Sequence, residues 1–575
     1  MNYFALACDF DATLADRAVV AKGTVDALQR LVGSGRKLVL VTGRQLDDLQ
    51  RIFPHLSLFE RVVAENGAVL FNPSNGETKL LAEQPPQVFI EALRQRHVWP
   101  LATGLVVVAS EQPEDAKILT VIRELGLELQ VIYNKGSVMV LPSGVNKGTG
   151  LSAALAEMCL SHHNTVGIGD AENDHALLNA CECGVAVSNA IETLRQRADI
   201  VTSAANGAGV REIIERLLQD DLRGARNRLR RQPILIGTAA DGTKVCIDTF
   251  ETSLLIAGPS SSGKSTLMIG LLERLREAEF QVCLIDPEGD YSQLESIVTL
   301  GSAERPPNVS EVVQILSNPK SSLIINLLGL PLSDRPLFFA ALFPKLQELR
   351  ARMGRPHWII VDEAHHLLPK ERSQVSEVIP RNLTGVILIT VHVDSVFQAA
   401  LKSMSRILAV GGSPEETIRQ FSTALGAPPP VYSPLLSRPG DVFLWSPENG
   451  RGPVALRPQP PSSEIRRHKR KYAEGTLGPE ASFFFKGPAG KLNLRAQNLN
   501  MFIQIAEGVD DETWMHHLRR GDYSRWIHEA IKDDVLAREV HDIEINGFEK
   551  NGNQSVQRTR AAVIDAINRR YTQHE

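Results

Sequence analysis

Cysteine is scarce in this chain of 575 residues, which holds six cysteines and no Cys-x-x-Cys pair. Cysteines scattered in this way predict no disulfide framework and no regular zinc site, and they favour the reducing cytoplasm as the location. The sequence also lacks an apolar run long enough to cross a bilayer, and its first residues lack the basic segment of a signal peptide. We therefore expect a protein that is not anchored in a membrane.

Neither sign of charge dominates, because 62 Lys and Arg residues are balanced by 67 Asp and Glu residues, for a net charge of −5. This balance argues against a protein that coats nucleic acid through its bulk charge, although local basic segments remain. Hydrophobic residues make up 43% and charged residues 22% of the chain, as in ordinary globular proteins. A chain of this length predicts about three or four domains of about 150 residues each.

A phosphate-binding pattern lies in the middle of the chain. Residues 254–257 predict a buried strand, residues 258–265 fit G-x-x-x-x-G-K-[ST], and a helical pattern follows. The glycine-rich backbone and the helix N-terminus would surround phosphate oxygens. Lys264 would reach the β- and γ-phosphates, and the Ser265 hydroxyl would hold Mg²⁺. The residues expected to bind ATP are Gly258, Pro259, Ser260, Ser261, Ser262, Gly263, Lys264, Ser265 and Thr266.

Polar residues close three short apolar strands in the first part of the chain, which are predicted over residues 4–8, 37–41 and 165–169. Lys147 lies between the second and third strands and opens a helix predicted over residues 149–159. Ligands bind at the carboxyl ends of parallel strands, so we expect these polar side chains to meet at one edge of a sheet. The strand-closing residues are Asp9, Asp11, Thr42, Gly43, Asp170 and Asp174.

This ordered set of residues resembles the four motifs of the haloacid dehalogenase superfamily of phosphatases. Residues 64–68 and 138–148 resemble its Cof-type and sucrose-phosphatase-like branch, in which an α/β cap is inserted between the second and third motifs. The resemblance implies a Rossmann-like core over residues 1–81 and 146–218, with the cap over residues 82–145. Ala12 departs from the glycine usual in the family.

The resemblance also implies a mechanism that depends on Mg²⁺. Asp9 would attack phosphorus and form an aspartyl-phosphate. Asp11 would protonate the leaving oxygen and then deprotonate the hydrolytic water. Mg²⁺ would be held by Asp9, the backbone carbonyl of Asp11 and Asp170, with Asp174 as a direct ligand or as support for one.

The substrate implied by the resemblance is a small phosphomonoester such as a sugar phosphate. Thr42, Gly43 and Lys147 would bind the phosphoryl oxygens and offset their charge. Basic residues of the cap could meet a sugar hydroxyl or a second phosphate, and solvated surface charge is their alternative interpretation. These cap residues are Arg94, Arg96, His97, Lys117 and Lys135.

A second set of acids follows the phosphate-binding pattern. Residues 358–361 predict a strand that ends in Asp362 and Glu363. Asp362 would hold Mg²⁺ through water, and Glu363 would polarise the water that attacks ATP. A further strand over residues 385–390 ends near His392, which is the candidate γ-phosphate sensor.

The runs 286–291 and 361–365 resemble the HerA/FtsK-like ATPases, many of which are hexameric DNA translocases. This resemblance implies a RecA-like P-loop ATPase domain over residues 232–458 and a homo-oligomer, with a hexamer as one arrangement. A neighbouring subunit's arginine often completes such a site, and Arg381 and Arg438 are the candidates. His392 departs from the glutamine usual at the sensor position.

The remaining segments are two linkers and a tail. Residues 219–231 and 459–475 read as linkers with basic runs at 223–231 and 466–471, which could be solvated or could contact nucleic acid. Helical periodicity predicts a small, mainly helical domain over residues 476–575. The helices are expected over residues 492–506, 511–519, 523–532 and 554–571.

The sequence therefore predicts an α/β protein with a haloacid dehalogenase core and cap, a P-loop ATPase and a helical domain. Our first hypothesis is a bifunctional, Mg²⁺-dependent phosphomonoesterase coupled to an ATPase, acting on a small phosphorylated substrate and ATP. The alternative is an ATP-driven nucleic-acid motor, in repair or phage defence, whose phosphatase acts on nucleotides or DNA ends. A third hypothesis, a nucleotide-gated scaffold without catalysis, is disfavoured by Asp362 and Glu363.

Overall fold

A computed structural model divides the chain into two compact units, Met1–Gln459 and Pro460–Glu575. Among the helices it describes, none combines the length and apolar character that a membrane span needs. The structure describes residues 2–224, 233–248, 252–260, 262–291, 294, 297–370, 379, 383–430, 440–447, 452–461, 472–473, 477, 482–488, 490, 492–531, 533–546 and 553–572.

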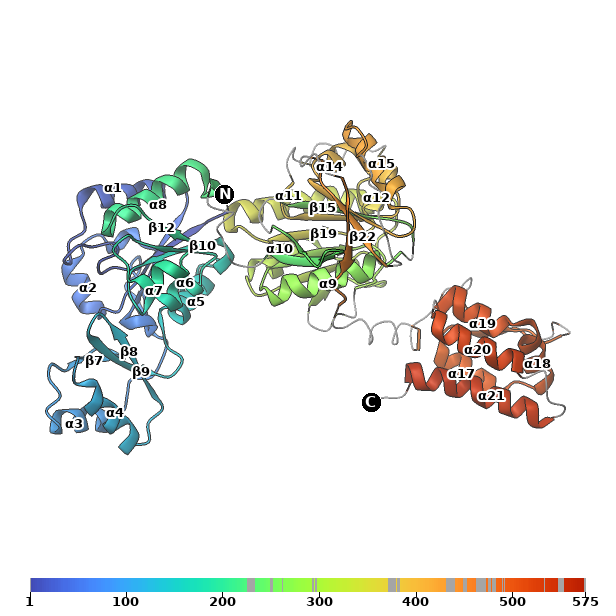
Figure 1. Ribbon diagram of the computed structural model, residues 1–575, viewed down its shortest axis with the longest axis horizontal. Helices are drawn as coiled ribbons and strands as arrows, with labels where there is room; N and C mark the ends of the chain where they lie inside the picture. The colour runs from blue at the N-terminus through green and yellow to red at the C-terminus, as the bar shows by residue number, and fades with distance from the viewer. Residues whose placement is uncertain are drawn as a thin grey trace. The chain divides into compact units, whose positions relative to one another are not determined.

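The first sheet has eight strands in the order β12-β11-β10-β1-β2-β3-β4-β5. Neighbours from β12 to β3 are parallel, which confirms the three predicted strands, whereas β4 and β5 are antiparallel. Helices cover both faces, so β1 and β10 are buried throughout (Figure 1). The strands are β1 (Ala5–Cys8), β2 (Lys37–Val41), β3 (Arg61–Ala64), β4 (Val69–Asn72), β5 (Glu77–Leu80), β10 (Thr165–Gly169), β11 (Cys183–Ala186) and β12 (Ile200–Val201).

Two groups of helices pack against this sheet, with α1 and α8 side by side on one face and α5, α6 and α7 on the other (Figure 1). Helix α5 begins at Lys147 and not at the predicted residue 149. The reason is Asn146, whose side chain accepts hydrogen bonds from the N–H groups of Gly148 and Thr149 and caps the helix. The helices are α1 (Lys22–Gly33), α2 (Leu46–Ile52), α5 (Lys147–Glu157), α6 (Asp174–Asn179), α7 (Glu192–Arg197) and α8 (Asn206–Asp220).

The cap is a four-stranded sheet in the order β6-β7-β9-β8, with α3 and α4 on one face (Figure 1). Glu65 anchors it to the core, because its buried carboxylate accepts hydrogen bonds from the N–H groups of Leu105, Val106 and Val107 at 2.7–2.8 Å. The cap elements are α3 (Gln87–Gln95), β6 (Ala102–Thr103), β7 (Val108–Glu111), α4 (Asp115–Glu124), β8 (Leu129–Asn134) and β9 (Ser137–Pro142).

The second sheet has eleven strands in the order β14-β13-β23-β22-β21-β15-β20-β19-β16-β18-β17. Strands β21 to β17 in this order are parallel, and the hairpin β13–β14 extends the antiparallel edge. The strands are β13 (Ile234–Ala239), β14 (Lys244–Ile247), β15 (Ser253–Ala257), β16 (Val282–Asp286), β17 (Val298–Leu300), β18 (Leu323–Asn326), β19 (Trp358–Val361), β20 (Val386–Thr390), β21 (Arg406–Val410), β22 (Val442–Trp445) and β23 (Val454–Pro458).

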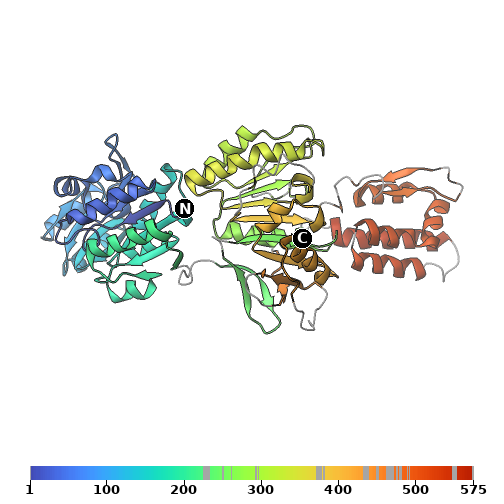
Figure 2. The ribbon, with the colours of Figure 1, turned by 90° about the horizontal axis from the view of Figure 1, so that it is seen from above.

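Separate hydrophobic cores lie on the two faces of this sheet. One core contains α9, and the other contains α10, α11, α14 and α15. The long helix α11 lies along its face of the sheet (Figure 2). The helices are α9 (Lys264–Glu277), α10 (Val309–Ser317), α11 (Arg335–Met353), α12 (Ala364–Leu367), α14 (Gln398–Lys402) and α15 (Pro414–Leu425).

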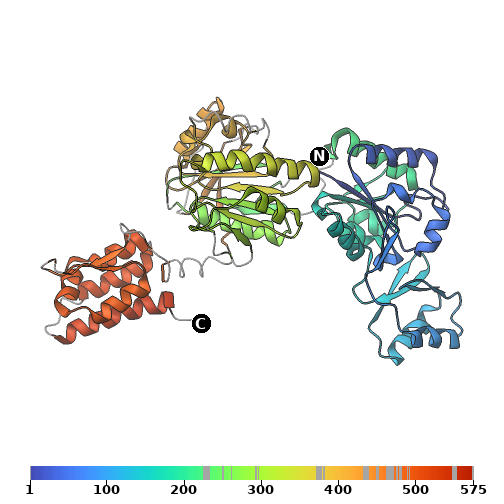
Figure 3. The same ribbon diagram turned by 180° about the vertical axis from the view of Figure 1, so that it is seen from behind.

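The C-terminal unit is mainly helical, as predicted (Figure 3). One expectation was wrong, because part of the helix predicted over residues 492–506 is the strand β25, which pairs with β24. Phe483 and Phe485 of β24 pack against Phe502, so the hairpin covers the helical core. The elements are β24 (Phe483–Phe485), β25 (Leu494–Ala496), α17 (Leu499–Gly508), α18 (Asp511–Arg520), α19 (Asp522–Trp526), α20 (Asp534–Asn546) and α21 (Asn553–Ile567).

Candidate active sites

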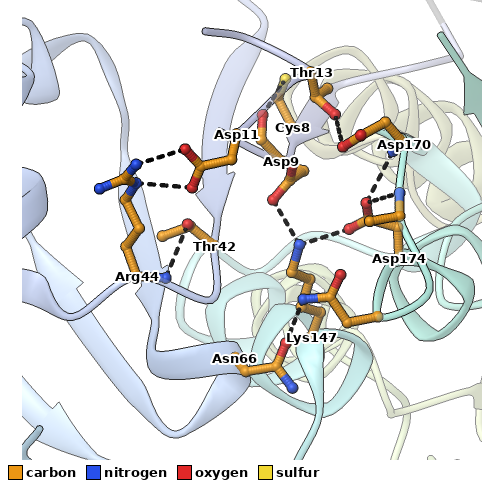
Figure 4. A network of polar contacts seen from close by, with 12 residues as sticks. Cys8, Asp9, Asp11, Thr13, Thr42, Arg44, Asn66, Lys147, Asp170 and Asp174 are labelled. Carbon is orange, nitrogen blue, oxygen red and sulfur yellow. Dashed lines mark hydrogen bonds and ion pairs between the residues drawn. The ribbon is translucent and has the colours of Figure 1, made fainter. Parts of the chain in front are cut away.

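Four of the predicted residues meet at the carboxyl ends of β1 and β10 (Figure 4). The Nζ atom of Lys147 lies 2.5 Å from Oδ1 of Asp9 and 2.6 Å from Oδ1 of Asp174. Asp9, Asp170 and Asp174 each place a carboxylate oxygen within 4.8 Å of the other two. The N–H groups of Asp170 and Ala171 donate to Oδ2 of Asp174 at 2.9 Å and hold it in place. We call these four buried side chains the acid centre.

The acid centre has more negative than positive charge. Burial raises the pKa of Asp9 well above its usual range, and the nearby Asp174 and Asp170 add to this effect against Lys147. Burial also raises the pKa of Asp170. Burial alone would lower the pKa of Lys147, but the carboxylates of Asp174 and Asp9 outweigh it and raise the pKa. Three clustered carboxylates with one buried ammonium fit a hard divalent cation such as Mg²⁺.

Asp11 points away from the acid centre toward Arg44 (Figure 4). The guanidinium of Arg44 donates two hydrogen bonds of 2.7 Å to the Asp11 carboxylate and one of 2.5 Å to Asp48. Thr42 is fully buried at the end of β2, where its hydroxyl accepts a hydrogen bond from the Arg44 N–H at 3.1 Å. Arg44 therefore orients the predicted general acid, and it lies directly after the predicted Thr42 and Gly43.

One basic residue of the cap reaches the acid centre. Lys135 lies in the turn between β8 and β9, and its ammonium pairs with Asp170. By contrast, Arg96 pairs with Glu124 and Lys117 pairs with Glu114, both within the cap. The cap thus places a partly exposed cation beside the acid centre.

The phosphate loop has the predicted strand–loop–helix order between β15 and α9. Gly258 is required by close packing, since a Cβ atom there would lie 1.9 Å from the carbonyl oxygen of Val410, and Gly263 has a φ of +98°. The Lys264 ammonium donates to the carbonyl oxygens of Gly258 and Pro259 at 2.9 and 2.8 Å. Burial lowers the pKa of Lys264.

The predicted acids Asp362 and Glu363 directly follow β19, and Asp286 lies at the end of the neighbouring strand β16. Asp362 is buried, and burial together with the neighbouring Glu363 raises its pKa to about 8. Glu363 has a φ of +41°, and its N–H donates to Oδ1 of Asp362 at 2.9 Å. Asp286 accepts hydrogen bonds from the N–H groups of Asp290 and Tyr291, while burial raises its pKa to about 6.

Thr390 and His365 connect His392 to these acids. The Thr390 hydroxyl donates to the His392 carbonyl and accepts from the His392 N–H, each at 3.1 Å. Nδ1 of His365 lies 3.2 Å from that hydroxyl and 3.4 Å from Oε2 of Glu363. The rings of His365 and His392 meet edge to face, with centroids 5.8 Å apart. Burial lowers the pKa of His365 to about 4, so this ring is neutral near pH 7.

Comparison with known proteins identifies the first part of the chain. The haloacid dehalogenase-like hydrolase family matches residues 6–103 and 105–214. A phosphoglycolate phosphatase of Methanothermobacter thermautotrophicus is 30% identical over 223 residues, which are 37% of this chain and 98% of the relative. The chain belongs to the haloacid dehalogenase-like hydrolases. Phosphoglycolate phosphatase 2 of Saccharolobus solfataricus is 28% identical over 221 residues, which are 38% of this chain and 93% of the relative.

A second family, described as the central domain of the helicase HerA, matches residues 234–352. The match includes the phosphate loop and Asp286. The protein is thus a haloacid dehalogenase-like hydrolase joined to a HerA-like domain, as the two sequence resemblances predicted.

Sequence reasoning assigned no role to several polar residues around the haloacid dehalogenase site. Arg44 follows Thr42 and Gly43 directly after a predicted strand, and this position could have indicated a role in the site. Asn173 donates to Asn66 at 2.9 Å, and the Thr13 hydroxyl donates to Asp170 at 2.9 Å. Partners more than 100 residues apart gave no signal in the sequence.

Some predicted residues lie outside the described part of the chain. These are Ser261 of the phosphate loop, the arginine candidates Arg381 and Arg438, and most of the two basic runs, at residues 225–231 and 466–471. Pro259, Ser260, Ser262 and Thr266 are described in the loop and the first turn of α9.

Proposed function

We propose that the protein is a Mg²⁺-dependent phosphomonoesterase joined to an ATPase. The observation that carries the phosphatase proposal is the acid centre, in which Lys147 is held between Asp9 and Asp174 at 2.5 and 2.6 Å. The family membership supports a hydrolase with Asp9 as its nucleophile. Two separate sites, one at Asp9 and one at Lys264, then perform two separate hydrolyses.

The side chains of the acid centre share the phosphatase chemistry with Asp11 and Thr42. Asp9 attacks phosphorus in line and forms an aspartyl-phosphate. Asp11, oriented by Arg44, donates a proton to the leaving oxygen and later takes one from water. Thr42 and Lys147 bind the phosphoryl oxygens.

Asp9, Asp170 and Asp174 are the residues that would hold Mg²⁺. Their carboxylate oxygens lie within 4.8 Å of one another. The negative charge of these three buried groups exceeds the positive charge of the single buried ammonium of Lys147. When bound, the ion supplies positive charge that offsets the oxygens of the phosphoryl group.

The substrate we propose is a small phosphomonoester with a second anionic group. Lys135 supports this proposal, because its ammonium stands beside Asp170 where a bound substrate would project from the site. The relatives named as phosphoglycolate phosphatases support it as well. Sugar phosphates, the class expected from the sequence, belong in the same test.

For the ATPase, we propose that Lys264 leaves the loop carbonyls and binds the β- and γ-phosphates. The Ser265 hydroxyl and Asp362 would hold Mg²⁺, and Glu363 would polarise the attacking water. His392 stays the proposed γ-phosphate sensor, within a network that also contains Thr390 and His365.

A pair of variants tests both activities in the full chain. Phosphate release is measured with Mg²⁺ from ATP, 2-phosphoglycolate, sugar phosphates and nucleotides. We expect Asp9→Asn to abolish only phosphomonoester turnover and Lys264→Ala to abolish only ATP turnover. If the wild-type protein hydrolyses no phosphomonoester in this panel, the phosphatase proposal is wrong for these substrates.

The HerA-like match favours a second candidate, an ATP-driven motor on nucleic acid that assembles as a homo-oligomer, with a hexamer as one arrangement. ATP hydrolysis would then rise with DNA and fall steeply with salt, because phosphate contacts release counterions. Unchanged ATP hydrolysis over a range of DNA concentrations at low salt would exclude this candidate. Sedimentation with and without nucleotide measures the assembly.

A further inference from the structure

A buried set of contacts joins the phosphatase and ATPase parts of the first unit, and we call it the seam. Polar and ionisable side chains buried in this way need partners, because an unpaired one is strongly destabilising. Exposure to solvent is at most 2% for four of its members, His163, Asn164, Phe280 and Arg355. The seam consists of Cys159, His163 and Asn164 on the phosphatase side and Phe280, Arg355 and His357 on the ATPase side.

His163 belongs to both sides of the seam. Its ring stacks on Phe280, with centroids 3.7 Å apart and planes at 10°. Nδ1 lies 2.6 Å from Oε2 of Glu182, and Nε2 lies 2.7 Å from the carbonyl oxygen of Ala278. One ring nitrogen therefore contacts a side chain of the phosphatase part and the other contacts a backbone oxygen of the ATPase part. His163 thus bridges the two parts with both of its ring nitrogens.

Arg355 and His357 add two directional contacts. The Arg355 guanidinium donates to the carbonyl oxygen of Cys159 at 2.6 Å and to Oε1 of Gln281 at 2.9 Å. Nδ1 of His357 accepts from the Gln281 N–H at 2.9 Å, so Nε2 carries the proton that it donates to Asn164 at 3.2 Å. Burial lowers the pKa of His357, which agrees with a neutral ring. A shift of either side would leave these buried groups unpaired.

Three catalytic strands begin at the seam. Phe280 lies two residues before β16, which ends at Asp286. His357 directly precedes β19, which is followed by Asp362. Asn164 directly precedes β10, which leads to Asp170. A strand rises about 3.3 Å per residue, so each acid lies only about 15–20 Å along its strand from the seam. Displacing one end of a packed strand displaces the other.

We propose that the seam couples the two active sites, so that nucleotide bound at the phosphate loop changes phosphomonoester turnover at Asp9. This inference rests on the proposed function. Nucleotide would shift the ends of β16 and β19, and the seam would transmit that shift to β10 and the acid centre. The coupling is reciprocal for binding, so an anion bound in the acid centre changes nucleotide affinity by the same factor.

The experiment measures phosphomonoester turnover by the full chain with and without a saturating non-hydrolysable ATP analogue. We expect turnover to change at least about fivefold, the lower range of known couplings. A fluorescent nucleotide confirms that the phosphate loop is occupied. Unchanged turnover at full occupancy would overturn the inference and leave the phosphatase proposal intact.

Two variants test the seam itself. Phe280→Leu removes the stacked ring but keeps an apolar side chain, and His163→Gln removes the ring whose two nitrogens contact both sides. We expect both to keep turnover without nucleotide and nucleotide affinity within about threefold, and to reduce the nucleotide response to less than about twofold. Glu279→Gln is the matched control, because Glu279 is a 76% exposed neighbour that pairs with His162 at the rim, and it should keep the full response. A full response in both seam variants would overturn the inference.

A readout without turnover separates this inference from the proposed function. Hydrogen exchange of residues 159–169 is measured in the full chain with and without the analogue. The seam predicts that bound nucleotide changes the exchange of this segment in the wild type and not in Phe280→Leu. If wild-type exchange changes but no phosphomonoester is hydrolysed, the coupling stands and the phosphatase proposal fails. If nucleotide binds and the exchange is unchanged, the coupling fails.

Discussion

The two candidate active sites differ in the groups that contact their lysines. In the acid centre, the Lys147 ammonium lies between the carboxylates of Asp9 and Asp174 at 2.5 and 2.6 Å. In the phosphate loop, the Lys264 ammonium is folded onto two backbone carbonyls at 2.9 and 2.8 Å. The nearby Asp362 has its pKa raised to about 8 by burial, with Glu363 as the next cause.

The difference shows which groups surround the buried ammonium in each site. The acid centre contains its own countercharge and is assembled before any ligand arrives. The phosphate loop keeps its lysine on neutral carbonyl oxygens, from which phosphate oxygens can draw it away. We therefore expect Lys147 to contribute to folding as well as to chemistry, and Lys264 to contribute mainly to ligand binding.

The strongest test of this comparison replaces each lysine by methionine. Lys147→Met leaves three buried carboxylates without the ammonium, and removing one partner of a buried pair destabilises by about 3–5 kcal/mol. Hydrogen exchange of β1 and β10 without Mg²⁺ measures that loss. Lys264→Met is the control and should change local stability by less than about 1 kcal/mol while it abolishes nucleotide binding. Equal losses in the two variants would contradict the comparison.

A smaller effect is expected at Arg44, which holds Asp11 by two hydrogen bonds of 2.7 Å. Arg44→Lys keeps the charge but loses the paired geometry, so kcat should fall about 10- to 100-fold, a part of what general acid–base catalysis contributes. KM should change less than kcat. Steady-state kinetics over pH 5–9 measure this, and an unchanged kcat would exclude Arg44 as the residue that positions Asp11.

The pH dependence of stability provides a third test on the ATPase side. Burial raises the pKa of Asp286 from 3.8 to about 6, so the folded state holds a proton that the unfolded state has already lost. The resulting stability is present below about pH 4 and is lost as the pH rises to about 6. Asp286→Asn should flatten this change in thermal unfolding of the HerA-like part. A wild-type transition that does not depend on pH between 4 and 6 would contradict the expectation.

The smallest expected effect is at an exposed ion pair of the phosphatase part. The side chains of Arg30 and Glu215 form this pair and are 55% and 52% exposed. Arg30→Ala should leave the hydrogen exchange of β1 and β10 nearly unchanged, because solvent screens exposed pairs. A small effect at Arg30 beside a large loss in Lys147→Met would show that the stability contributed by Lys147 depends on burial and not on charge pairing alone.

Much of both active sites could be predicted from the sequence because each is built from short local patterns. A strand of four or five apolar residues followed by a polar residue predicted the positions of Asp9, Asp170 and Asp362. Capping side chains limited the accuracy of the predicted element ends: Asn146 caps α5, which begins two residues before the predicted start. The strand β25 replaces predicted helix because its partner β24 lies nearby in the fold.

The sequence by itself determined the order of the strands and phosphate-binding turns, since these depend on the periodicity of neighbouring residues and on glycines at required positions. Only the tertiary structure decided the partners of the polar and aromatic side chains. Arg44 with Asp11, Lys135 with Asp170 and His163 with Phe280 are separated by 33, 35 and 117 residues in the chain. Their contacts depend on how sheets and helices pack, and a local pattern carries no information about a partner at such a distance.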